Sequence, residues 1–243
     1  SEVSKEQPFG LGLRLSNKAS EELEMGNNMS EFKQWLDTNH LYVFTMNGFP
    51  YGNFHDERVK DMVHAPDWTT NDRLTYTKRL FRQLSELLPE GMNGGISTSP
   101  ITYKYWHKTD SAIKNAFETG AKNMLEVAFQ LHNIENTTGK YLHLDIEPEP
   151  DGLLENSEEV LAFYSDFLVP MGITYFKQEL GVDANKAEAI IKKYITVCYD
   201  VCHFSLAYEE PIDTFTKFKV NNIRVGKIQV SAALKILFNG KND

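Results

Sequence analysis

The sequence is poor in cysteine and has no long apolar run. Its 243 residues include two cysteines, Cys198 and Cys202, too few for an extended disulfide framework. Their i, i+4 spacing across a predicted strand and turn argues against a bond between them. We therefore expect a reducing compartment, the cytoplasm. No stretch reaches the roughly 18 apolar residues of a membrane span, and the first residues lack the apolar core of a signal peptide.

The chain also lacks excess positive charge, the common nucleotide-binding motifs and the nucleophile motif of serine hydrolases. Its formal net charge is −9, and nucleic acid as a general partner would require a basic surface. There is no GxGxxG, no Walker loop and no GxSxG. The length suits one large domain with a proper core, or at most two small ones.

Six apolar segments of strand length alternate with longer segments of helical periodicity. The predicted strands are Gly10–Ser16, Leu41–Asn47, Gly95–Ser99, Tyr141–Glu147, Ile195–Asp200 and Val225–Ser231. The predicted helices are residues 19–38 with an interruption near Gly26, 72–88, 110–134, 157–169, 173–193, and a helix beginning at Ala232. Strands that alternate with helices in this way are typical of βαβ units and a parallel sheet.

The predicted strands alternate between apolar and polar residues. In the fourth strand, Leu142, Leu144 and Ile146 alternate with His143, Asp145 and Glu147. In a (β/α)8 TIM barrel the apolar face meets the helices and the polar face lines the interior. An open sheet with one solvated face is the alternative. We predict a single TIM-barrel domain over residues 1–243. Only six of the eight βα units of such a barrel are visible, so either two strands are cryptic or the chain lacks material at its ends.

Metal-ligand chemistry gathers where these strands end, which is where barrel active sites lie. Asp200 closes a strand and His203 follows three residues later; Glu147 and Gln229 occupy similar positions on other strands. Carboxylate, imidazole and amide oxygen suit a divalent cation such as Mn²⁺, Zn²⁺, Mg²⁺ or Fe²⁺. The alternative is that Asp200 caps a turn and His203 packs in the core.

Glu147 and Glu149 each precede a proline, which favours extended backbone at both residues. Glu147 continues the inward face of its strand, so we expect it to serve as a ligand or general base. Glu149 is a candidate for substrate binding, or part of a solvated acidic loop.

Other polar and aromatic residues of the strand ends are candidates for contact with substrate. A Gly/Pro/aromatic loop follows the second strand and suits a flat ligand or a sugar ring. Lys227 is a candidate catalytic group, or a neutraliser of the carboxylates. His55, in that loop, is a further candidate catalytic group that could ligate metal or bind substrate, or a loop-packing or surface histidine. The remaining candidates for substrate contact are Asn47, Phe49, Tyr51, Arg14 and Ser231.

Several segments together resemble EboE, a group of xylose-isomerase-like TIM-barrel proteins from a bacterial metabolite-traffic gene cluster. They are Pro8–Ser16, Asn47–Gly52 with His55, Ala65–Trp68, Ile96–Thr98, Glu147–Pro150 with Leu153–Glu155, Tyr199–His203 and Gly226–Ser231. The Asp-x-Cys-His element is also similar to one in endonuclease-IV-like barrels. That likeness implies metal binding by Asp200 and His203, and a corresponding role for Glu147.

The residues and the resemblance together predict a metal-dependent enzyme of the sugar isomerase/epimerase type that acts on a small polar metabolite. A non-catalytic metabolite-binding or export-assembly protein is the first alternative, and a metal-dependent phosphoesterase is the second. The resemblance also implies that the chain lacks the first and last strands of the barrel, and that its partners are encoded in the same gene cluster.

Overall fold

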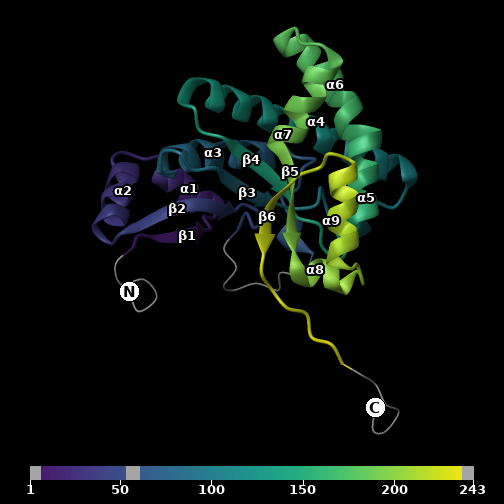
Figure 1. Cartoon of the computed structure of the whole chain (residues 1–243), viewed down its shortest axis with the longest axis horizontal. Coiled ribbons are helices and arrows are strands. Elements are labelled where there is room, and N and C mark those ends of the chain that lie inside the picture. Colours follow the sequence, from purple (N-terminus) through teal and green to yellow (C-terminus); the bar gives the residue numbers. More distant parts are fainter. Residues whose placement is uncertain (1–6, 53–60, 237–243) are drawn as a thin grey trace.

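The chain forms an α/β fold around one parallel sheet (Figure 1). The structure is a computed structural model that describes residues 7–52 and 61–236. Its strands are paired in sequence order, each parallel to the next, as in a barrel of βα units. They are β1 Phe9–Leu13, β2 Leu41–Asn47, β3 Gly94–Thr98, β4 Leu142–Ile146, β5 Ile195–Asp200 and β6 Val225–Gln229.

Helices connect the strands and cover the outer face of the sheet (Figure 1). Most begin at a side chain that caps the first turn; Thr70 and Thr109 each accept a hydrogen bond from the backbone N–H three residues later. The α-helices are α1 Asn17–Leu23, α2 Asn28–Thr38, α3 Asn71–Leu87, α4 Asp110–Thr138, α5 Ser157–Phe163, α6 Val169–Leu180, α7 Ala184–Tyr194, α8 Val201–Leu206 and α9 Pro211–Val220. Tyr164–Leu168 form a π-helical turn between α5 and α6.

The sheet curls so that its polar face becomes an interior. Every residue of β3, β4 and β5 is buried, and β6 lies within contact range of β3 and β4 across the curl. Within the described residues β1 and β6 are not paired, so the six strands make a curled half-barrel. All six predicted strands and their parallel arrangement in a curled α/β half-barrel are confirmed. β2 and β5 have the predicted bounds, and the other strands differ from them by at most three residues at either end.

The helix prediction needs correction at three points. Residues 173–193 are not one helix: Gly181 has φ 66° and ends α6, and Asp183 caps α7. The short helices α8 and α9 were not predicted. Residues 232–236 are not helical. Leu234 and Ile236 there are 84% and 59% exposed, and a short helix that buries no apolar face is unstable in water.

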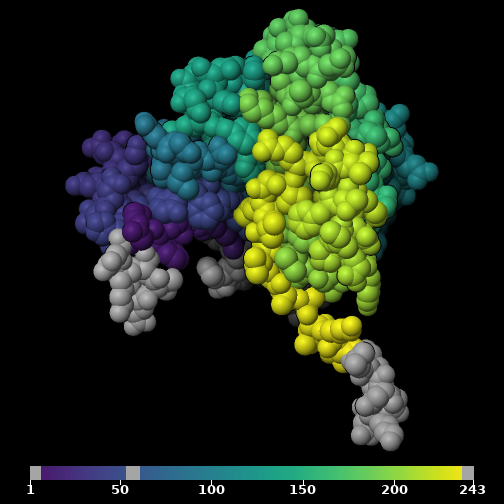
Figure 2. Space-filling model, viewed as in Figure 1, coloured from purple at the N-terminus to yellow at the C-terminus, as the bar shows by residue number. Residues whose placement is uncertain are grey.

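The space-filling view shows how the segment after β6 and the helices before it lie on the molecule (Figure 2). The segment that follows β6 leaves the body of the molecule, whereas α8 and α9 pack against it. Among the helices of residues 7–52 and 61–236, none combines the length and apolarity needed to cross a membrane.

Candidate metal centre at the carboxyl ends of the strands

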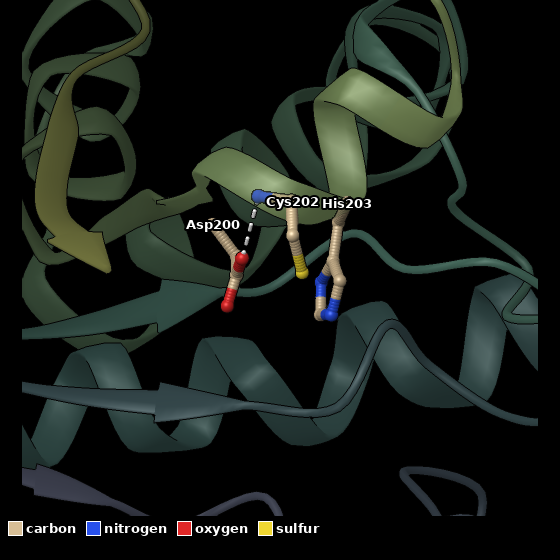
Figure 3. A group of neighbouring side chains, drawn as sticks. All are labelled: Asp200, Cys202 and His203. Atoms are coloured by element: carbon tan, nitrogen blue, oxygen red, sulfur yellow. Dashed lines mark hydrogen bonds between the residues drawn. The ribbon is translucent and has the colours of Figure 1, made fainter. Parts of the chain in front are cut away.

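Asp200 ends β5 and begins α8, and this double position organises the centre. Its Oδ1 atom accepts a hydrogen bond of 3.0 Å from the backbone N–H of Cys202, which starts the helix. The first turn of α8 then brings the side chains of Cys202 and His203 to the side of Asp200 (Figure 3). One ligand atom from each of the three residues lies within 4.8 Å of the others.

Gln229 joins this group to Glu147. Its Nε2 atom donates to Asp200 Oδ2 and to Glu147 Oε1, each at 2.8 Å. β6 lies beside β5, with Gln229 in register with Asp200. Glu147 follows β4, where its backbone N–H donates to Thr98 O at 2.9 Å. The parallel register therefore places side chains from β4, β5 and β6 at one edge of the sheet.

His203 completes the cluster and is held in one orientation. Its Nδ1 atom lies 3.0 Å from Pro148 O and 4.0 Å from Glu147 Oε1. Because a carbonyl oxygen can only accept, Nδ1 carries the proton, and Nε2 is the nitrogen with a lone pair for a ligand. A backbone carbonyl that orients a histidine in this way is common at metal sites.

The two carboxylates have different surroundings. Burial raises the pKa of Glu147 above its ordinary value, and Asp200 nearby raises it further, although His203 and Lys227 act in the opposite direction. Burial also raises the pKa of Asp200. Hydrogen bonds from Ser231 and Cys202 outweigh that effect and hold the pKa of Asp200 below its ordinary value. Asp200 is thus an anion at neutral pH, whereas Glu147 takes up a proton more readily.

The donor set fits a divalent cation. Glu147 is 5% exposed, and its Oε2 atom has no hydrogen-bond partner among the described residues. A buried carboxylate oxygen without a donor is costly, and a cation between Glu147, Asp200 and His203 would remove that cost. Two carboxylates and an imidazole are ligands that suit Zn²⁺, Fe²⁺ or Mn²⁺.

The structure thus brings together Glu147, Asp200, His203 and Gln229, which the sequence indicated as metal ligands. The capping alternative for Asp200 is also realised, because Oδ1 serves the helix while Oδ2 faces Gln229. Ser231, expected at the substrate, instead donates to Asp200 Oδ1 and accepts from the Cys202 N–H at 2.9 Å.

Other candidate residues lie around the cluster rather than in it. Lys227 Nζ donates to Ser97 Oγ at 3.0 Å inside the curl of the sheet. Asn47 Oδ1 accepts from the Phe49 N–H at 3.0 Å, so this side chain shapes its own loop. Phe49 is buried with its ring 5.3 Å from that of His64.

The remaining candidates occupy the loops above β1, β2 and β4. Glu149 Oε1 lies 3.0 Å from His64 Nε2. Tyr51 is half-buried with its ring edge against Tyr76, and Arg14 follows β1 at the surface. His55 lies outside the described residues.

Three residues of this region were missed by sequence reasoning. Cys202 belongs to the cluster; its place between Asp200 and His203 was the available signal. His64 is buried against Glu149 and aromatic rings. Arg73 is fully buried and donates to Gly48 O at 2.7 Å and Pro66 O at 2.8 Å, which ties two loops together. No sequence pattern pointed to the last two.

Comparisons with known proteins return likenesses of structure alone. No protein-family model and no curated protein matches the chain. An IolI protein crystallised with a bound zinc atom is 16% identical, with TM-score 0.44, covering 84% of this chain and 57% of that one. The probable 3-DHS dehydratase AsbF of Bacillus anthracis is 9% identical, with TM-score 0.46, covering 87% and 59%.

A D-tagatose 3-epimerase-like protein is 12% identical, with TM-score 0.49, covering 91% of this chain and 75% of that one. The chain therefore spans less than three-fifths of the length of the first two proteins. At this level of identity and TM-score the likenesses carry no argument about the reaction. The EboE resemblance is not supported by these comparisons.

Proposed function

We propose that this chain belongs to a divalent-metal-dependent enzyme that moves a proton on a small polar metabolite, in the manner of a sugar isomerase or epimerase. One observation carries the proposal. Glu147 is a buried carboxylate whose Oε2 atom finds no hydrogen-bond partner in the part of the chain that the structure describes, and it lies beside Asp200 and the oriented imidazole of His203. Burial without a donor is the arrangement expected of an apo metal or catalytic carboxylate.

Asp200 and Glu147 take different roles in this proposal because their pKa values are shifted in opposite directions. When the pKa values of two neighbouring carboxyl groups are shifted apart, one group stays ionised and the other can exchange a proton. Asp200 is the constant anionic ligand. Glu147, whose pKa is raised by burial, is the proton acceptor of the pair, and Gln229 joins it to Asp200.

A cation held by Asp200 and His203, with Glu147 beside it, would polarise a carbonyl or hydroxyl oxygen of the bound metabolite. A carbon next to a polarised carbonyl releases its proton more easily. Glu147 accepts that proton while the electron pair moves toward the carbonyl oxygen. Return of the proton to the other face, or to the neighbouring carbon, gives epimerisation or isomerisation. Lys227 and His55 remain proposed contacts for substrate.

The first experiment measures metal content. The full chain is purified without chelator and analysed for metals, beside Asp200→Ala/His203→Ala and the matched control Asp166→Ala/His107→Ala, which changes the same residue types elsewhere. Wild type and control should carry roughly one equivalent that the site variant lacks. A wild type without metal that also takes up no added Mn²⁺ or Zn²⁺ would sink the proposal.

The second experiment looks for proton exchange. A panel of ketoses in D₂O is incubated with metal-loaded protein, and NMR follows deuterium entry beside the carbonyl. Wild type should catalyse exchange and Glu147→Gln should not. Hydrolysis of p-nitrophenyl phosphate without exchange would favour the phosphoesterase alternative. Metal binding with neither activity would favour metabolite binding or export assembly, the role that the EboE resemblance suggests.

A further inference from the structure

Cys202 lies between Asp200 and His203 on the first turn of α8, and all three side chains extend to the same side of the helix (Figure 3). Cys202 is half-buried and carries a free thiol. Capping of α8 uses its backbone N–H and not its sulfur. The Sγ atom lies within 4.8 Å of a ligand atom of each neighbour, so small side-chain rotations bring all three into ligand distance.

Gln229, by contrast, has its amide turned the wrong way for a ligand. Gln229 Nε2 lies 2.8 Å from Asp200 Oδ2 and donates to it, so the group that Gln229 presents to Asp200 is the NH₂. The same NH₂ reaches Glu147. The amide oxygen of Gln229 therefore faces away from both carboxylates, and Gln229 orients these ligands instead of binding the cation itself.

A second observation, independent of the sulfur, also points to a cation at this place. Glu147 Oε2 is buried without a hydrogen bond from the described residues, beside the imidazole of His203. A cation held by Asp200 and the nitrogen of His203 would lie next to this oxygen. The sulfur of Cys202, on the same turn of α8, would be a further ligand of that cation.

We infer that Cys202 is a thiolate ligand of this metal, and that the resident ion is thiophilic, of the Zn²⁺ class, and not Mg²⁺ or Ca²⁺. This inference rests on the proposed metal centre and adds its metal class. On binding, the S–H bond breaks, the sulfur–metal bond forms and the proton leaves to solvent. Sulfur favours zinc and its cobalt substitute over hard cations, which prefer oxygen ligands.

Co²⁺ is the probe, because a thiolate bound to Co²⁺ gives a sulfur-to-metal charge-transfer absorption in the near ultraviolet. Metal-free full-length chain is titrated with Co²⁺, beside Cys202→Ser and Cys198→Ala. Cys198 is the matched control, since it is the other cysteine and lies buried in β5. Wild type and Cys198→Ala should develop the band. Cys202→Ser should bind Co²⁺ without it and lose Zn²⁺ affinity by at least about tenfold.

A second measurement needs no variant. Alkylation of Cys202 by iodoacetamide, followed by peptide mass spectrometry, should be slowed by Zn²⁺ and left unchanged by Mg²⁺. Co²⁺ bound by wild type without the band, together with alkylation that Zn²⁺ does not slow, overturns the thiolate inference alone. Failure of wild type to bind Co²⁺, Zn²⁺ or Mn²⁺ at all is a different result, because it removes the proposed metal centre itself.

Discussion

Glu147 and Asp200 show how neighbouring groups decide the chemistry of a carboxylate. Asp200 sits at the start of a helix and receives hydrogen bonds from Cys202 and Ser231, all of which favour its charged form. Glu147 is more deeply enclosed and shares one amide donor with Asp200. The native fold therefore bears a cost for the ionised form of Glu147 that the unfolded chain does not.

This cost predicts an unusual pH dependence for Glu147→Gln. A raised pKa means that the native state keeps its proton while the unfolded state has released it, so stability falls as pH rises through that interval. The neutral variant removes the effect. In the metal-free protein it should be more stable than wild type at about pH 7.5, and the two should converge at about pH 3.5, below the ordinary glutamate pKa.

Urea unfolding at both pH values measures the difference, with Glu179→Gln, an exposed residue of α6, as control. The contribution of Asp200 depends on pH in the opposite direction. Because its pKa is lowered in the native state, Asp200 stabilises the fold at pH values above the ordinary aspartate pKa, and this stabilisation is lost as the pH falls through the native pKa. A Glu147→Gln variant that is less stable than wild type at neutral pH without metal would contradict the raised pKa.

At the scale of elements, the centre depends on how closely β6 approaches β4 and β5. Gly226 of β6 lies over the buried pair of His143 and Asp145, where Nδ1 and Oδ1 are 2.7 Å apart. A Cβ at position 226 would collide with Asp145 and Thr196. Glycine is therefore required here by close approach, and the same strand carries Gln229 to the carboxylates.

Gly226→Ala should displace β6 and lower the free energy of unfolding by about 1–3 kcal/mol. Because Gln229 moves with the strand, metal affinity should fall as well. Gly12→Ala on β1 is the matched control, since its Cβ would make an ordinary contact of 3.5 Å with Thr45. Urea unfolding and Zn²⁺ titration measure the two effects. Equal behaviour of both variants would show that β6 tolerates the added methyl group.

At the scale of the whole molecule, the centre joins strands that are distant in sequence. Glu147, Asp200 and Gln229 come from β4, β5 and β6, and each strand is separated from the next by helices. The unfolded chain does not hold these side chains together, so a metal that binds them stabilises the native state.

Zn²⁺ at about 100 times its Kd should therefore add about 2.7 kcal/mol to the free energy of unfolding. For a domain of this size that corresponds to a rise in Tm of roughly 5–10 °C. Differential scanning calorimetry with and without Zn²⁺ measures the shift, and Asp200→Ala/His203→Ala should abolish it. A shift that persists in this double variant would place the metal elsewhere on the chain.

Much of this architecture was predictable because its signals are local. Alternation along Leu142–Glu147 marks a strand with one polar face, and the parallel order follows from the helices between strands. The continuous apolar periodicity over 173–193 misled the helix prediction, because it hid the stop at Gly181 and the cap at Asp183. The helix predicted from Ala232 is absent over residues 232–236, because apolar residues in the sequence do not show whether another part of the protein is there for a helix to pack against.

The amino-acid sequence by itself determined which chemical groups end each strand, since strand ends and residue types are local properties of the chain. Asp200, His203 and Glu147 were recognisable on that basis, and their role as ligands stays a prediction. Only the tertiary structure decided which groups meet. It turned Gln229 into a shared donor to Asp200 and Glu147, and it paired His64 with Glu149. Those relations depend on strand register and helix placement, which arise from packing between segments far apart in sequence.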